Sequence, residues 1–96
     1  MPIVAVFEFP GEDLAKYRKV FEAGGPPITD QPGRQSHICF RTDDGFTVVD
    51  VWLDEAAFVA FGEVIGAATA TAGLDARPEV HPLVATISPD GEWTTY

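Results

Sequence analysis

The sequence predicts a small α+β domain whose elements follow the order β-α-β-β-α-β. Three observations predict this class. The chain has 96 residues, which is the size of one domain. Four runs of β-branched and aromatic residues are typical of strands, and two longer segments carry apolar residues at helical spacing. Clusters of Pro, Gly and Asp separate these segments, as expected for turns.

The first strand is predicted for residues 2–9, and Pro10-Gly11 ends it. Both of its faces are mostly apolar, which indicates a central strand covered on both sides. Four apolar residues at helical spacing then predict a helix over residues 12–23. These four residues are Leu14, Tyr17, Val20 and Phe21. Gly24-Gly25 ends the helix, because the prolines that follow cannot continue it.

Residues 24–35 are predicted to be irregular, since they are rich in Gly and Pro. A loop of this length in so small a domain is often a lid or a binding loop. An ordered Pro-rich connector is the alternative, and the sequence leaves both open.

The second and third strands are predicted for residues 36–42 and 46–53, joined through Asp43-Asp44-Gly45. An Asp-Gly pair between two apolar runs is typical of a tight hairpin. A second helix follows directly, with Asp54 as its N-cap, and runs to about Leu74. Its apolar residues form one stripe. The stripe consists of Ala57, Phe58, Phe61, Val64, Ile65 and Ala68.

The fourth strand is predicted for residues 79–87, and Pro82 confines it to an edge because proline cannot donate to the ladder. Residues 88–96 are predicted to be a tail, in which Trp93 and Tyr96 pack on the body or on a partner chain. The order of elements predicts a ferredoxin-like domain over residues 1–87, with a four-stranded antiparallel sheet and two helices on one face. Because the other face is also apolar, we expect a two-fold homodimer through it.

Fifteen acidic side chains outnumber six basic ones and give a net charge of −9. This balance argues against nucleic acid and against anionic lipid as partners. The single cysteine, Cys39, excludes an internal disulfide and an all-cysteine zinc site. We recognise no signal peptide and no run of roughly 18 apolar residues, so we expect a cytoplasmic protein that does not enter a membrane.

A two-residue hairpin loop places odd-numbered residues of the second strand on the same face as even-numbered residues of the third. One face then holds His37, Cys39 and Arg41 beside Val48, Asp50 and Trp52. The other face holds Ile38, Phe40, Val49, Val51 and Leu53, which we expect to form core. The first face must be paired, wet or built for a ligand, because an unpaired buried charge is costly.

His37 and Asp50 are close enough in this register to bond, which would orient the imidazole as a general base. Trp52 offers a flat apolar wall and one N–H donor for an aromatic ligand. The alternative is a polar sheet face with a closed Arg41–Asp50 pair and Trp52 as core. His81 and Tyr17 are further candidates for the pocket. Cys39 as a nucleophile lacks a separate base and orienting group.

A metal site built from His37, His81 and Asp50 has suitable ligand types but no motif behind it, so we expect no metal.

One stretch of the sequence resembles the antibiotic biosynthesis monooxygenase superfamily of dimeric α/β barrels. Its members often carry Pro-Gly before the second strand, as in Pro32-Gly33, and a Val-x-Val-Trp run ending the third, as in Val49–Trp52. An acidic N-cap and a helix phenylalanine follow, as at Asp54 and Phe58. The likeness covers about residues 2–87, and its specific motif covers residues 32–61.

The resemblance implies a pocket between sheet and helices that Trp52 lines, a homodimer, and a small aromatic or polyketide-like substrate handled without a cofactor. The superfamily's oxygenases use an asparagine beside this tryptophan, but this sequence contains none. His37 and Asp50 would therefore have to act in its place, with Arg41, Tyr17, Phe58, Phe61 and His81 around the ligand. A cofactor-independent monooxygenase is the first hypothesis. An isomerase or cyclase, and a non-catalytic ligand-binding or stress-response dimer, are the alternatives.

Overall fold

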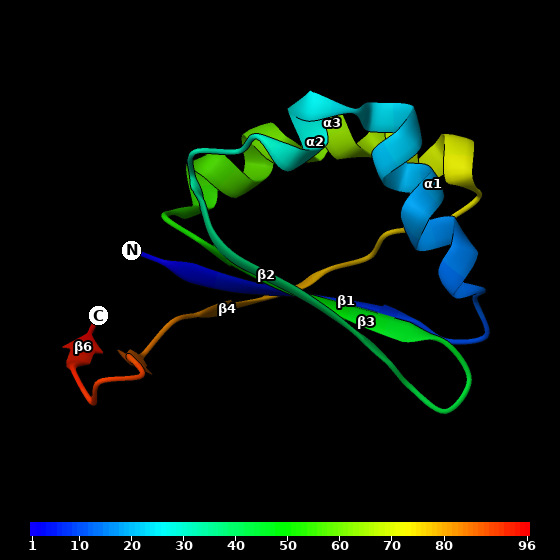
Figure 1. The fold of residues 1–96 in the computed structure, drawn as a ribbon. Coiled ribbons are helices and arrows are strands. Elements are labelled where there is room, and N and C mark those ends of the chain that lie inside the picture. Colours follow the sequence, from blue (N-terminus) through cyan, green and yellow to red (C-terminus); the bar gives the residue numbers. More distant parts are fainter.

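A computed structural model describes all residues, Met1–Tyr96. Four strands form one antiparallel sheet in the order β2-β3-β1-β4. They are β1 (Ile3–Phe9), β2 (Arg34–Arg41), β3 (Phe46–Trp52) and β4 (Glu79–Pro82). The helices α1 (Leu14–Gly24) and α3 (Glu55–Ala72) lie on the same side of this sheet (Figure 1). The predicted ferredoxin-like α+β fold is confirmed.

Side-chain caps fix where the two long helices begin. The carboxylate of Asp13 accepts a hydrogen bond from the amide of Ala15 at 2.8 Å, and that of Asp54 accepts one from Ala57 at 2.8 Å. Gly73 ends α3 at a φ of 78°, in the left-handed region that glycine adopts without strain. The helix limits expected from the sequence therefore hold to within one or two residues.

The core lies between the sheet and the helices. Along β1, the alternate residues Ile3, Ala5, Phe7 and Phe9 are buried beneath the helices. The neighbouring strand β3 contributes Phe46, Val48 and Trp52, and α3 contributes Phe61, Ala68 and Ala72. β1 pairs with a strand on each side, as expected for a central strand.

The hairpin between β2 and β3 has the predicted register, because His37 lies opposite Asp50 and Cys39 lies opposite Val48. Gly45 does not adopt a positive φ. A Cβ at this position would instead fall on the carbonyl oxygen of Phe9. The glycine therefore lets the hairpin lie close against the end of β1.

The segment expected to be irregular contains one helical turn, α2 (Pro26–Thr29), with a proline in its first turn. Proline cannot continue α1, but it is well suited to begin a new turn because its amide needs no partner there. Ile28 in this turn is buried against the core. The segment is thus an ordered connector that closes one side of the helical layer.

The fourth predicted strand is divided. β4 ends at Pro82, and the chain then forms a separate hairpin from β5 (Ala85–Ile87) and β6 (Trp93–Thr95). The single strand predicted over residues 79–87 is therefore wrong, and residues 88–96 do not run on as a free tail. Figure 1 shows this hairpin projecting from the body. Trp93 does not pack on the body, since 63% of it is exposed.

The sheet face turned away from the helices is open. Ile38, Phe40 and Leu53 are about half exposed in the single chain, at 55%, 47% and 51%. The expectation that these residues form core is therefore wrong for one chain, because no element covers that face.

The helix α3 also has the length and mean hydropathy, 1.2, of a membrane-crossing helix, which the sequence analysis did not expect. Its 18 residues owe this hydropathy to many Ala, Val and Phe residues. Phe61, Ala68, Thr69 and Ala72 pack into the domain, while Glu63 stands exposed near the helix centre. A charge at this depth of a bilayer is costly.

Candidate functional site

Three polar side chains form a hydrogen-bonded chain beneath the helices. Nδ1 of His37 lies 2.6 Å from Oδ1 of Asp50, and Nε2 of the same ring lies 2.7 Å from the hydroxyl of Tyr17. Asp50 is 2% exposed and lies in the middle of β3, opposite His37 in the register. Tyr17 reaches them from α1 and packs edge-on against Phe21.

This arrangement favours one tautomer of the neutral imidazole. A carboxylate acceptor at Nδ1 favours the tautomer that carries its proton there, so neutral His37 donates to Asp50. Nε2 then accepts the hydroxyl hydrogen of Tyr17. The pair predicted from the hairpin register, His37 with Asp50, is present in the structure, and the alternative pair of Arg41 with Asp50 is absent.

The three side chains line a cavity of about 50 Å³ between the sheet and the helices. Twelve of its 16 lining residues are hydrophobic, among them Phe9, Phe46 and Phe61. The polar groups at its wall are therefore few and lie in apolar surroundings, which is how small-molecule sites are commonly built.

Burial controls the ionisation of two groups here. Burial raises the pKa of the Tyr17 hydroxyl, the neighbouring Cys39 and Asp50 add to the rise, and the positive charge of Arg34 opposes it. Burial also raises the pKa of the Cys39 thiol. Tyr17 is therefore a hydrogen-bond donor at neutral pH. Cys39 also stays a protonated thiol at neutral pH, and a protonated thiol is a poor nucleophile.

Arg34 is a site residue that the sequence analysis missed. Alternation from His37 would turn Arg34 to the open face, but a β-bulge between Arg34 and Ser36 shifts the register by one residue. Arg34 consequently lies opposite Trp52 and lines the cavity. Pro32-Gly33 just before the strand was the available signal of irregular backbone at this point.

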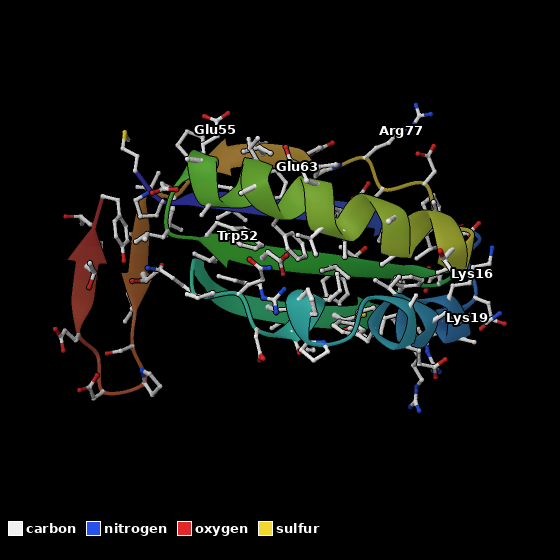
Figure 2. The ribbon with its side chains drawn as sticks, turned by 90° about the horizontal axis from the view of Figure 1, so that it is seen from above. Lys16, Lys19, Trp52, Glu55, Glu63 and Arg77 are labelled. Atoms are coloured by element: carbon white, nitrogen blue, oxygen red, sulfur yellow. The ribbon has the colours of Figure 1, made fainter.

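Trp52 is completely buried and does not line the cavity. Its ring packs against Phe58 and Phe61, at centroid distances of 5.9 and 4.8 Å. Its indole Nε1 has no hydrogen-bond partner. Figure 2 shows Trp52 at the end of β3 near the first turns of α3. Trp52 therefore packs behind Phe61, which lines the cavity, and does not line the cavity itself.

The remaining predicted residues divide between the site and the surface. Phe61 lines the cavity, and Phe58 lines a neighbouring groove of about 400 Å³ beside α3. Arg41 is the last residue of β2 and its side chain is exposed. Both Arg41 and His81 were expected near the ligand, and the structure places neither there.

His81 lies opposite Val4 on the open sheet face, so it cannot meet His37. Its nearest charged neighbour is Glu79, at 3.5 Å. Since the candidate metal site needed both histidines, its ligands do not come together, and no cluster of three metal-ligating side chains occurs elsewhere in the chain.

No protein-family model and no curated protein matches the sequence. Solved structures do match it. Rv0793 from Mycobacterium tuberculosis superposes with a TM-score of 0.70 at 14% identity, over 92% of this chain and 100% of that one. SnoaB, a cofactor-independent oxygenase from Streptomyces nogalater, gives 0.61 at 24% identity, over 88% and 93%. A candidate antibiotic biosynthesis monooxygenase from Caulobacter crescentus gives 0.56 at 20%, over 83% of each chain.

These matches confirm the resemblance at the level of the fold. The chain has the ferredoxin-like architecture of the antibiotic biosynthesis monooxygenase-like proteins. At identities of 14–24%, the likeness shows the fold alone, and the activity has to be argued from the site.

Proposed function

We propose that the protein removes a proton from a small phenolic or enolic aromatic molecule bound between the sheet and helices α1 and α3. The observation that carries this proposal is the orientation of His37. Asp50 holds one nitrogen of its ring at 2.6 Å, and the other nitrogen is turned toward Tyr17 at the wall of an apolar cavity. An imidazole held in this way is a suitable general base.

The proton would move as follows. A substrate hydroxyl takes the position of the Tyr17 hydroxyl at Nε2 of His37, and the imidazole accepts its proton. The Asp50 carboxylate stabilises the imidazolium that forms. Tyr17 keeps its own proton because burial raises its pKa, so it is then free to donate a hydrogen bond to the substrate oxygen.

The resulting phenolate or enolate is electron-rich at carbon. In a cofactor-independent oxygenase, the class to which SnoaB belongs, it would react directly with dioxygen. In an isomerase or cyclase, it would rearrange without dioxygen. Both routes begin with the same proton transfer, so the role of His37 does not depend on the choice.

Binding requires the cavity to open. A cavity of about 50 Å³ is small beside typical ligand sites of roughly 300–1,000 Å³. The groove beside α3 shares Phe7, Ile65, Thr69, Leu74 and Ala76 with the cavity, so these residues form a common wall. Displacement of the larger side chains would join the two spaces into a site of sufficient volume.

A ligand-binding protein without turnover is the second candidate. It is favoured by the 2.7 Å bond between Tyr17 and Nε2 of His37, because the base is already occupied. In this case the aromatic molecule would fill the opened cavity and Tyr17 would stay in place.

We further propose that the protein is a homodimer through its open sheet face. The support is the row of apolar residues there, with Ile38 and Phe40 about half exposed and Val49 and Val51 between them and β1. Pairing of two such faces would bury this surface in the manner of a two-fold interface.

The test is turnover of a panel of polycyclic phenols by the purified full chain, followed by oxygen consumption and by product analysis. His37→Gln should lower the rate by about a hundredfold or more. His81→Gln serves as the matched control, since His81 lies on the other face of the sheet. Saturable binding with no turnover of any phenol would favour the second candidate.

A further inference from the structure

We infer that Arg34 selects the ligand of this site: it binds an anionic oxygen, so the preferred ligand is a planar aromatic phenolate or enolate. This inference rests on the proposed location of the ligand and adds its charge. It assigns a specificity-determining residue that lies apart from the Tyr17–His37–Asp50 chain.

The position of Arg34 supports this role. The bulge in β2 turns Arg34 to the inner face, where it lines the same cavity as His37 and Asp50. Its guanidinium carbon lies 5.6 Å from the centre of the Phe61 ring and 5.8 Å from that of Trp52. Two aromatic rings therefore hold the planar cation beside an apolar space, as in other cation–π contacts.

The hydrogen bonds of Arg34 leave much of the cation unpartnered. Nη2 donates to the carbonyl oxygens of Ile28 at 3.0 Å and Thr29 at 3.2 Å, and neither Nη1 nor Nε has a protein acceptor. A guanidinium carries five N–H donors in a fixed fork that fits an anionic oxygen. The N–H groups at Nη1 and Nε of Arg34 are thus available to donate to a ligand.

The guanidinium of Arg34 also has no carboxylate counterion nearby. No carboxylate lies within 4.0 Å of its nitrogens, and the only carboxylate at the cavity, that of Asp50, is already bound to His37. A partly buried cation without a counterion is unfavourable, and an anionic ligand would supply the missing charge. The charge of Arg34 also acts on Tyr17, because it lowers the pKa of the Tyr17 hydroxyl and so opposes the effect of burial.

The charge of the whole chain makes this local cation necessary. At a net charge of −9, the protein repels anions in general. The labelled cations Lys16, Lys19 and Arg77 lie toward the other end of the molecule from Trp52, and none lines the cavity (Figure 2). An anion formed in the site would therefore depend on Arg34 for its stabilisation.

A purely structural role would look different in an experiment. If Arg34 only braces α2 through its two carbonyl contacts, its loss should weaken every ligand alike. If Arg34 binds an anionic oxygen, its loss should weaken an anion and spare a neutral molecule of the same shape.

The experiment uses the full chain and two probes, 4-nitro-1-naphthol and its methyl ether. Ionisation of the naphthol is visible in its absorption, and the ether cannot ionise. We expect the wild type to lower the apparent pKa of the bound naphthol relative to the free molecule. Arg34→Met should weaken phenolate binding about tenfold to a hundredfold while leaving ether binding within about threefold. Arg34→Lys should restore part of the difference.

Arg18→Met is the control, because it removes the same charge from an exposed position on α1. The inference is overturned if Arg34→Met binds the phenolate as tightly as the wild type does. It is also overturned if this variant weakens both probes equally, or if the wild type binds neither probe or prefers the ether.

His37→Gln separates this inference from the proposed function. A wild type that prefers the phenolate but turns over no phenol would end the proposed proton transfer and leave the role of Arg34 standing. Turnover that depends on His37 but not on Arg34, with equal affinity for both probes, would support the proposed proton transfer and overturn the role of Arg34.

Discussion

Asp50 contributes a carboxylate that is almost fully buried, and its side-chain partner is the His37 ring at 2.6 Å. Removing the ring by His37→Ala therefore leaves a buried charge without its partner. We expect this variant to lose about 1–3 kcal/mol of unfolding free energy. Urea denaturation measures the loss.

The double variant His37→Ala with Asp50→Asn is the internal control for that loss. Removing the charge together with its partner should recover part of the stability, because the neutral amide is cheaper to bury than a carboxylate. Stability losses that simply add would show that the two side chains do not interact.

Tyr17 gives a pH dependence whose sign follows from burial. Because the pKa of its hydroxyl is raised in the folded chain, the folded state holds this proton more tightly than the unfolded state does. The resulting stability is complete below the ordinary tyrosine value of about 10 and is lost as the pH rises through the folded-state pKa.

Tyr17→Phe should therefore flatten the fall in unfolding free energy above about pH 10, as measured by urea midpoints at a series of pH values. Absorbance titration of tyrosinate should show the wild-type hydroxyl ionising above its ordinary range. Ionisation at or below that range would contradict the effect of burial.

At this same scale, alternation along strands predicted some site residues and not others. The register that pairs His37 with Asp50 follows from a two-residue hairpin, and the sequence identifies that hairpin. Arg34 was missed because a bulge reverses the alternation, and Pro32-Gly33 just before the strand indicates irregular backbone without giving the register. Arg41 was misplaced because the period of a strand says which face a residue is on, but not whether its side chain is covered there.

Among the elements, the junction of α1 and α2 depends on a glycine. A Cβ on Gly24 would clash with the buried side chain of Ile28 and lie 3.3 Å from the Cβ of Ala68. Gly24→Ala should therefore lower the unfolding free energy by about 1–3 kcal/mol through overpacking, measured by urea denaturation.

Gly62→Ala is the matched control, since a Cβ there meets no atom within 4 Å and the residue lies in the exposed part of α3. The same substitution should stabilise the protein at this position by about 0.5–1 kcal/mol. Equal effects at both glycines would show that helix propensity, and not packing on Ile28, decides the outcome.

Element limits were predictable where capping residues mark them, as at Asp54 and Gly73. They were not predictable where tertiary contacts decide. The turn of α2 forms because Ile28 is buried, and a Pro-rich sequence alone does not reveal that contact. Residues 79–87 read as one strand, but pairing with β1 extends only from Glu79 to Pro82.

At the scale of the whole molecule, the chain exposes more surface than its mass requires. Its accessible surface is 6083 Å², whereas a compact monomer of this mass exposes about 5,400 Å². Its radius of gyration is 13.8 Å against about 12.5 Å expected for this length. The projecting β5–β6 hairpin and the flat open sheet face account for the difference in shape.

If the open face is the interface of a homodimer, a single charge placed on that face should separate the subunits. Phe40 is 47% exposed there and lies opposite Thr47, whose other neighbour is Glu8 of β1. Phe40→Glu would place two further carboxylates in a desolvated two-fold interface, at a cost of several kcal/mol. Sedimentation equilibrium should then show a dimer for the wild type and a monomer for this variant.

Val64→Glu introduces the same charge on the outer side of α3, where the side chain is 37% exposed and lines neither the cavity nor the groove. It should leave the dimer intact. The cavity lies on the helical side of the sheet, away from the proposed interface. A monomeric Phe40→Glu variant should therefore still bind an aromatic phenol, and any loss of affinity should come only from loosening of the sheet. A wild type that sediments as a monomer would refute the interface, and the open face would then need another partner.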